Sequence, residues 1–468
     1  MDNFPVLKVP VTFNERFTLE GRDVPAWTIV PSRGIPVYAE QPSSLSLTDP
    51  VPPKTTRWMT KTFRIGEFKY GRAIECIALI KLKSDPNKFR FLIDTGSCIN
   101  WITSDYQSER SRLPGSRGPP YLPTRIYYAR PGPYLSGQPN HDQKVYTIEY
   151  VDGSWYQYKR HEDRITLDSE FEGRVLTQNI MFEFGVLINS YLESNHDSQE
   201  RSPPKATFHD GMLGFGPTDR HSKMMTVMDS IISEDIIRFP SLTFHVSDKV
   251  SSQDEVKYHG TMIFGHPPDY YGEMHGPIPV EKVSGCKNHW IIKSGGKKIG
   301  ENIHSDNTLI LLDTGAIGIH LHNAMFVDAF HKEIHGATKA YGAWALPVAS
   351  DSRIPSLMIQ LGTGDSPYME VLPEFLKGEP INGTNLCWSR LYAWPDSLID
   401  GAQIPSDYDV IGMAAIFSLT LMYQFDTSEM TKSYERRKYV NRKGKEVDTH
   451  GDHIYWRQSW TQARNPSS

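Results

Sequence analysis

The chain has 468 residues, of which 38% are hydrophobic, so it is long enough to bury two substantial cores. Its formal net charge of −5 argues against a nucleic-acid partner, because such binding needs a basic surface that displaces counterions. No apolar run approaches the length of a membrane-spanning helix, which argues against a membrane partner, and the first residues lack the basic and apolar parts of a signal peptide.

Residues 1–60 are expected to form an N-terminal extension, which is proline-rich at Pro50–Pro53. Beyond it, the apolar run Phe91–Ile93 is typical of a buried strand and leads into the triplet Asp94-Thr95-Gly96. The Asp is therefore expected in a tight turn, where the Gly permits a close backbone approach and the Thr hydroxyl can bond backbone groups. One such triplet is weak evidence, since a chain of this length contains one by chance roughly one time in ten.

A long loop and a candidate strand follow the first triplet. Residues 105–143 are rich in Pro, Gly, Ser, Arg and Tyr, which is typical of a surface loop. The segment Tyr150–Ser154 comes next, and taken alone its tyrosine fits an ordinary amphipathic strand. Because the loop lies between the triplet and this segment, it could border the same cleft.

The same order of motifs occurs again in the second half. The run Leu309–Leu312 precedes a second triplet, Asp313-Thr314-Gly315. Later in each half, two apolar residues are followed by a Gly, at Met212–Gly214 and at Val410–Gly412. This repeated order predicts two related lobes rather than a solenoid, whose periods are much shorter, and the two turns could face each other.

Other candidate chemistry is weaker. His320 and His322 have a spacing that suits a metal, but no third ligand is evident, so structural histidines are favoured. Cys98 has no evident base partner, which favours a buried packing cysteine over a catalytic thiol. The basic C-terminal tail, residues 427–468, is expected to be a solvated extension rather than a binding arm.

Taken together, these motifs resemble the pepsin-like aspartic endopeptidases, and in particular their fungal members, over roughly residues 65–426. The matching motifs are Asp94-Thr95-Gly96-Ser97 with Trp101, Tyr150-Val151-Asp152-Gly153-Ser154, Phe208–Gly216 with one inserted residue, Trp290 before the second triplet, and Val410-Ile411-Gly412 with Phe425-Asp426. The resemblance implies an all-β-dominated, bilobal fold with a few short helices and an active-site cleft between the lobes. It implies an N-terminal lobe at 61–240 and a C-terminal lobe at 241–426, and it makes residues 1–60 either a degenerate pro-segment or an added first strand.

The resemblance also implies that Asp94 and Asp313 are the catalytic pair of an aspartic endopeptidase. Two carboxyls that lie next to each other cannot both ionise easily, so the pair shares one proton. One carboxyl can then act as a general base on water while the other donates to the scissile carbonyl. The residues expected to support the pair are Thr95, Gly96, Ser97, Thr314 and Gly315, and those expected to form the flap and bind substrate are Tyr150, Asp152, Gly153 and Trp101. No metal or other cofactor is expected, and the expected partner is a peptide or protein substrate of a monomeric enzyme.

Some positions depart from the family pattern. Ala316 stands where the first triplet has Ser97, so one hydroxyl donor is missing and we expect a pH optimum less acidic than pepsin's. Ile317 replaces a Ser or Thr that helps to hold the substrate backbone, and Val151 replaces a flap Gly. Asp152 stands where some fungal members of the family have an acidic residue that can pair with a substrate Lys on the amino side of the cleaved bond.

The main alternative is a pepsin-like protein that no longer cleaves and instead binds peptides or acts as an inhibitor. The alternative is favoured by Ala316, Ile317, Val151, the small number of cysteines and the missing signal peptide. Both intact triplets, Ser97 and Tyr150 favour the enzyme, which is preferred. The resemblance implies an extracellular or vacuolar location, although no signal peptide is visible. Extracellular disulfides are not supported by the four cysteines, which are Cys76, Cys98, Cys286 and Cys387.

Overall fold

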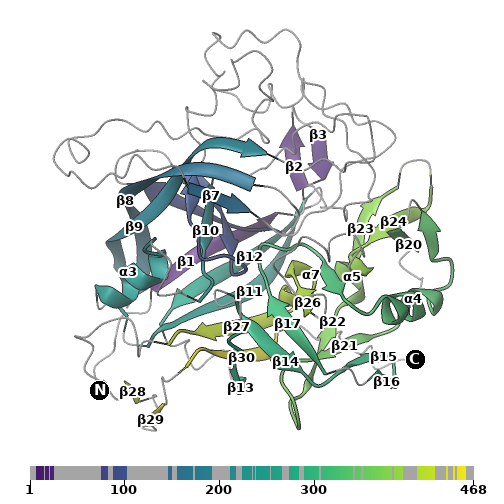
Figure 1. The fold of residues 1–468 in the computed structure, drawn as a ribbon. Helices are drawn as coiled ribbons and strands as arrows, with labels where there is room; N and C mark the ends of the chain where they lie inside the picture. Colours follow the sequence, from purple (N-terminus) through teal and green to yellow (C-terminus); the bar gives the residue numbers. More distant parts are fainter. Residues whose placement is uncertain are drawn as a thin grey trace.

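Most of the described chain lies in strands, and its four described helices are short (Figure 1). The expected all-β-dominated, bilobal class is therefore confirmed. The computed structural model describes residues 7–14, 16–19, 22–25, 75–82, 88–102, 146–149, 155–171, 174–191, 211–217, 224–234, 236–237, 239–252, 255–265, 273–283, 289–304, 307–340, 343–348, 353–381, 384–393, 408–426, 439–440, 446–447 and 451–459. Within these ranges, no helix has the length and apolar character needed to span a membrane. The expected loop 105–143, the flap segment 150–154 and Cys286 lie outside them.

One large sheet of 13 strands takes strands from both halves of the chain. Its order is β13-β30-β27-β11-β12-β1-β4-β5-β10-β6-β9-β8-β7, and in Figure 1 the strand β27 lies between the teal strand β11 and the yellow strand β30. The bounds are β1 Leu7–Asn14, β4 Glu75–Leu82, β5 Lys88–Asp94, β6 Trp101–Ile102, β7 Tyr146–Glu149, β8 Trp155–Phe171, β9 Arg174–Tyr191, β10 Gly211–Gly214, β11 Ser241–Ser252, β12 Glu255–Phe264, β13 His275–Pro279, β27 Leu419–Gln424 and β30 His453–Gln458.

Smaller sheets, two hairpins and the helices complete the described part of the fold. A five-stranded sheet has the order β14-β17-β26-β18-β25, and its strands are β14 Ile291–Ser294, β17 Thr308–Leu312, β18 Ile319–Leu321, β25 Leu391–Ala393 and β26 Tyr408–Ile411. Two four-stranded sheets contain β15 Lys297–Ile299, β16 Asn302–His304, β21 Leu357–Gln360 and β22 Tyr368–Val371, and β19 Thr338–Ala340, β20 Ala343–Pro347, β23 Lys377–Pro380 and β24 Leu386–Ser389. The remaining elements are the hairpins β2 Arg16–Leu19 with β3 Arg22–Pro25 and β28 Tyr439–Val440 with β29 Glu446–Val447, and the helices α3 Val227–Ser233, α4 Ala324–Lys332, α5 Pro373–Leu376 and α7 Met413–Ile416.

The repeated sequence motifs form the same arrangement in each half. In the first half, β10 pairs in parallel with β5, the strand that ends in Asp94, and antiparallel with β6. In the second half, β26 pairs in parallel with β17, directly before Asp313, and antiparallel with β18. Each apolar-apolar-Gly segment therefore lies beside the strand that leads into a triplet. The side chains of Phe91, Ile93 and Leu312 are fully buried, as expected for core strands.

An aromatic cluster joins the two halves beneath the triplets. Trp290, which is fully buried, packs against Tyr423 and Phe425 with ring centroids 4.9 Å away in each case. Its indole N–H donates to the carbonyl of Phe215 in the first half at 2.7 Å. Large buried aromatic rings contribute strongly to core packing, and a buried indole N–H needs an acceptor, so this residue ties the second-half core to the first.

Two terminal segments contribute strands to the large sheet. β1 lies between β12 and β4. β30 pairs with β27 and β13, and its side chains Ile454 and Trp456 are buried. The solvated extension expected after residue 427 is therefore wrong for β30, because the alternating apolar side chains of this strand cover one face of the sheet.

Candidate active site

The two Asp-Thr-Gly turns meet face to face. The Gly96 N–H donates to Asp94 Oδ1 at 2.8 Å, and the Gly315 N–H donates to Asp313 Oδ1 at 2.7 Å. A Cβ atom added to Gly96 would lie 2.4 Å from Asp313 Cγ, and one added to Gly315 would lie 2.6 Å from Asp94 Oδ1. Only glycine fits at these two places, and each glycine lets the opposite carboxyl approach its turn.

The threonines of the two triplets lock the turns to each other. The backbone N–H of Thr95 donates to Thr314 Oγ1 at 3.0 Å, and the N–H of Thr314 donates to Thr95 Oγ1 at 3.0 Å. Each hydroxyl then donates across the interface, from Thr95 to the Leu312 carbonyl at 3.0 Å and from Thr314 to the Ile93 carbonyl at 2.7 Å. Both threonines are buried, so this closed set of bonds satisfies groups that water does not reach.

Backbone hydrogen bonds at the two apolar-apolar-Gly segments hold the turns in place. In the first half, Phe215 N–H donates to the Asp94 carbonyl at 2.7 Å. In the second half, Asp313 N–H donates to the Ile411 carbonyl at 3.0 Å, and Met413 N–H donates to the Ala316 carbonyl at 2.8 Å. The position of each Asp is therefore set by backbone bonds that do not depend on its own side chain.

One carboxyl of the pair holds its proton more strongly than an ordinary carboxyl. Burial raises the pKa of Asp94 well above its ordinary value, and the neighbouring Asp313 carboxyl raises it further, both by its charge and by a side-chain hydrogen bond. The Gly96 N–H bond opposes this rise. Two carboxyls in this arrangement share one proton at a pH where an exposed carboxyl is ionised, so the site contains a base and an acid together.

The structure describes only part of the other predicted site residues. Ser97 Oγ accepts a hydrogen bond from the Ile99 N–H at 3.1 Å. Trp101 is buried and packs in a cluster with Tyr158 and Met212. Tyr150, Asp152 and Gly153 lie outside the described residues.

The two departures after the second triplet lie in apolar surroundings. Ala316 packs against the cluster that contains Ile291, Leu311 and Val410, and the side chain of Ile317 is buried. These contacts explain why apolar side chains fit there, since burying a hydroxyl without a partner is unfavourable. The second turn thus lacks the hydroxyl that Ser97 supplies next to the first.

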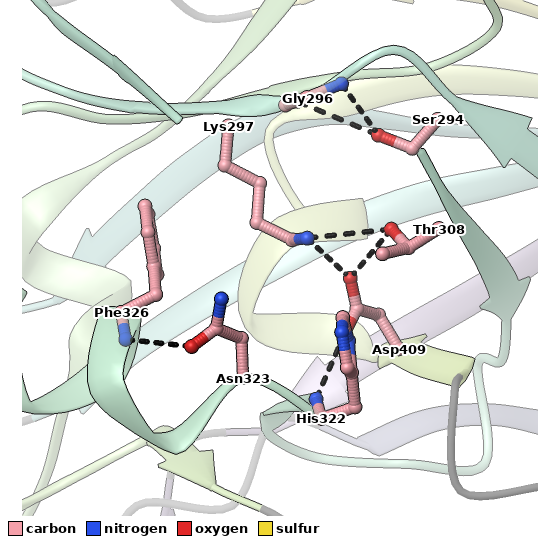
Figure 2. A network of polar contacts seen from close by, with 8 residues as sticks. All are labelled: Ser294, Gly296, Lys297, Thr308, His322, Asn323, Phe326 and Asp409. Atoms are coloured by element: carbon pink, nitrogen blue, oxygen red, sulfur yellow. Dashed lines mark hydrogen bonds and ion pairs between the residues drawn. The ribbon is translucent and has the colours of Figure 1, made fainter. Parts of the chain in front are cut away.

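A buried polar network, which sequence reasoning missed, lies at the opposite end of the strands that carry the second turn (Figure 2). Asp409, fully buried at the second position of β26, pairs with Lys297 Nζ at 2.8 Å and accepts from Thr308 Oγ1 at 3.1 Å. Its other oxygen accepts from the backbone N–H of His322 at 2.9 Å and lies 2.9 Å from His322 Nδ1. Hydrogen bonds and the Lys297 charge hold the pKa of Asp409 below its ordinary value, although burial opposes them.

This network joins residues from three strands and one strand end. Lys297 comes from β15, Thr308 from β17 and Asp409 from β26, while His322 directly follows β18. The sequence signal for it was a charged residue at the start of an otherwise apolar strand, Tyr408–Ile411. Such a residue needs a buried partner of opposite charge.

The two histidines with metal-like spacing have structural contacts instead. His320 stacks on Tyr392 with ring centroids 5.0 Å apart, and burial lowers the pKa of His320 to about 4. His322 belongs to the Asp409 network. In the part of the chain that the structure describes, no cluster of three or more His, Cys, Asp or Glu side chains could hold a metal ion. Cys98 is buried, as a packing cysteine would be.

A comparison with protein families agrees with this geometry. The model of the eukaryotic aspartyl protease family matches residues 76–431, which include both triplets and both apolar-Gly segments. No curated protein matches the chain closely enough to count as a relative.

Proposed function

Because the chain belongs to the eukaryotic aspartyl protease family, we propose that it is an aspartic endopeptidase in which Asp94 and Asp313 form the catalytic pair. The observation that carries this proposal is the reciprocal close approach of the two turns, in which each glycine makes room for the opposite carboxyl. The raised pKa of Asp94 supports it, because a shared proton supplies the acid and the base that peptide hydrolysis requires.

In the proposed reaction, the ionised carboxyl removes a proton from a water molecule, which attacks the scissile carbonyl carbon. The protonated carboxyl donates to the carbonyl oxygen, and a gem-diol forms. A proton then passes to the amide nitrogen and the C–N bond breaks, which yields a free carboxyl and a free amine. Thr95 and Thr314 hold the two turns at the distance that this proton sharing needs.

We propose substrate contacts for residues 150–154, because their sequence resembles the flap of the family. Tyr150 and Gly153 would close over an extended peptide, with Trp101 packed beside the first turn, and closure would exclude water from the scissile bond. Asp152 would accept a Lys on the amino side of the cleaved bond. A comparison of Lys and Leu peptides with the Asp152→Ala variant tests this, since only the Lys peptide should lose kcat/KM. That the protein is of the fungal kind stays a prediction.

The test of the proposed function is incubation with a denatured protein from pH 3 to 7, with fragments identified by mass spectrometry. The wild type should produce fragments, a statine-type transition-state analogue should block their formation, and Asp94→Asn should be inert. Asp365→Asn, which changes an exposed aspartate in another part of the chain, is the matched control and should cleave normally. If the wild type and Asp94→Asn are equally inert while the analogue still binds, the protein is a peptide-binding member of the family and the proposal fails.

A further inference from the structure

The hydroxyl of Thr95 has a third partner besides its two bonds with the second turn. The hydroxyl oxygen of Tyr423 lies within hydrogen-bond distance of Thr95 Oγ1, at 3.4 Å. Tyr423 belongs to β27 of the large sheet, and both side chains are fully buried. Buried hydroxyls take their partners from the protein rather than from bulk water. The contact therefore connects the first turn to a strand from the last part of the chain.

The bonds of Thr95 show which of the two hydroxyls donates. A hydroxyl has one hydrogen and two lone pairs. Thr95 Oγ1 gives its hydrogen to the Leu312 carbonyl at 3.0 Å, since a carbonyl can only accept, and one lone pair accepts from the Thr314 N–H at 3.0 Å. Only a lone pair is left for the third contact, so Tyr423 is the donor and Thr95 accepts.

This donation acts on the second turn, although Thr95 belongs to the first. Leu312 and Thr314 are the residues directly before and after Asp313. Because both other bonds of the Thr95 hydroxyl run to these two neighbours, the position of the hydroxyl affects the position of Asp313. A donor to an oxygen also strengthens that hydroxyl's own donation, since successive hydrogen bonds polarise one another. Tyr423 therefore stabilises the backbone on both sides of Asp313 through Thr95.

The packing around Tyr423 fixes its hydroxyl. On β27, Tyr423 pairs with Leu242 of β11 on one side and with Ile454 of β30 on the other. The centroid of its ring lies 4.9 Å from that of Trp290 and 5.8 Å from that of Phe244, which it meets edge-on. A ring that is enclosed in this way, on a strand paired along both edges, has little freedom to move. The phenol is thus held against the first turn.

The two threonines are supported unequally. The hydroxyl of Thr314 accepts from the Thr95 N–H and donates to the Ile93 carbonyl, and in the described ranges it has no third partner. Only the Thr95 hydroxyl receives a bond from the large sheet. The turn that benefits through Thr95 is the second, which lacks a hydroxyl at Ala316.

We propose that Tyr423 is a positioning residue of the aspartate pair, which holds Asp313 opposite Asp94 by its hydrogen bond to Thr95. This inference rests on the proposed function, because it assigns a role within the same site. At 3.4 Å the bond is longer than an ordinary hydroxyl hydrogen bond, so its loss should cost less than the loss of a threonine hydroxyl. Tyr423 is fully buried and is not a substrate contact, so the effect should appear in kcat rather than in KM.

The first test is a peptide assay of Tyr423→Phe, which keeps the ring and removes the hydroxyl. We expect kcat to fall about threefold while KM stays unchanged. Tyr455→Phe is the matched control, because it also loses a hydroxyl bond, from Tyr455 to Gln424 at 3.1 Å, but that bond joins β30 to β27 and involves no triplet. The control should keep the wild-type kcat. If Tyr423→Phe, folded by circular dichroism, also keeps it, the inference is wrong.

A double variant tests whether Tyr423 acts through Thr95. Thr95→Val keeps the shape of the side chain but has no hydroxyl for Tyr423 to bond. In this background Tyr423→Phe should lower kcat no further, because the interaction is already lost. An equal additional loss of kcat in the wild type and in Thr95→Val would show that Tyr423 acts by another route, and the inference would fail. A purely structural role would lower stability without this dependence of kcat on Thr95.

A binding measurement without turnover distinguishes this inference from the proposed function. The Kd of a statine-type transition-state analogue, measured by calorimetry, should rise about threefold in Tyr423→Phe and stay unchanged in Tyr455→Phe. A wild type that binds the analogue but cleaves nothing, with weaker binding in Tyr423→Phe, would support the positioning role and remove the catalytic proposal. An active wild type with the same Kd and kcat in Tyr423→Phe would overturn the role of Tyr423 alone. A wild type that neither cleaves nor binds would overturn both.

Discussion

Thr95 and Thr314 exchange equivalent hydrogen bonds, in which the backbone N–H of each donates to the hydroxyl of the other at 3.0 Å. The two residues are far apart in the sequence and come from the two different triplets, so these bonds fix the separation of the two turns. The carboxyl pair therefore forms only when both halves of the chain are folded against each other.

Removal of one threonine hydroxyl should therefore loosen both turns. Thr314→Val keeps the shape of the side chain but leaves the buried N–H of Thr95 without an acceptor, at a cost of about 1–3 kcal/mol. We expect the free energy of unfolding to fall by that amount and kcat to fall at least about tenfold, because the carboxyls are less well positioned. Chemical denaturation and a peptide assay measure the two effects. Thr314→Ser, which keeps the hydroxyl, should retain most of both, and equal losses in the two variants would contradict this role.

The missing hydroxyl after the second triplet predicts a less acidic optimum. Ala316→Ser should supply a donor to the ionised pair, which favours the charged form and lowers its pKa. The acidic limb of the pH profile of kcat/KM should then move to lower pH, while the wild type keeps a limb at higher pH. Two profiles that superimpose, or a wild-type maximum near pH 2–3, would refute the explanation.

The buried Asp409 network should be costly to break at one partner. Lys297→Met leaves the carboxylate of Asp409 buried without its cation, and we expect a loss of about 3–5 kcal/mol of unfolding free energy. Adding Asp409→Leu to the same chain should recover part of that loss, because no unpaired charge remains. Chemical denaturation at pH 7 measures both variants. A double variant as unstable as the single one would contradict this account.

The network also predicts a direction of pH dependence. The pKa of Asp409 is lower in the folded protein than in the unfolded chain. Its contribution to stability is therefore present above the unfolded pKa, about 4, and is lost as the pH falls through the folded pKa. In Asp409→Asn this acid-dependent part of the unfolding free energy should disappear.

His331 should destabilise the protein in mild acid. Its ring is fully buried between the Val327 carbonyl, 2.7 Å from Nδ1, and Ser389 Oγ, 2.8 Å from Nε2, and burial lowers its pKa to about 4. Between pH 6.5 and about 4 the unfolded chain binds a proton that the folded protein does not, so stability falls by about 3 kcal/mol over this range. Unfolding free energies of wild type and His331→Phe at pH 7 and 4.5 measure this. The variant should lose less stability between them, and an equal loss would contradict the assignment.

The sequence predicted the two Asp-Thr-Gly turns better than the buried Asp409 network and the strand β30. Short apolar runs and paired triplets located Asp94 and Asp313, because a strand end followed by Gly has few other structural explanations. Asp409 interrupts an otherwise apolar strand, but its partner Lys297 could not be assigned, because it lies far away in the sequence. The basic composition around β30 concealed an alternating strand, in which Ile454 and Trp456 are buried while their neighbours are more exposed. Long-range pairing of that kind depends on the tertiary fold, not on local composition.

The most direct test of the central claim is kcat/KM from pH 3 to 7 for the wild type, Asp94→Asn and Asp313→Asn with one peptide substrate. The account predicts a bell-shaped profile for the wild type and a loss of at least about a thousandfold in each variant, because each removes one of the two groups that share the proton. If either variant keeps the wild-type rate, the two carboxyls do not act as a pair and the account is wrong.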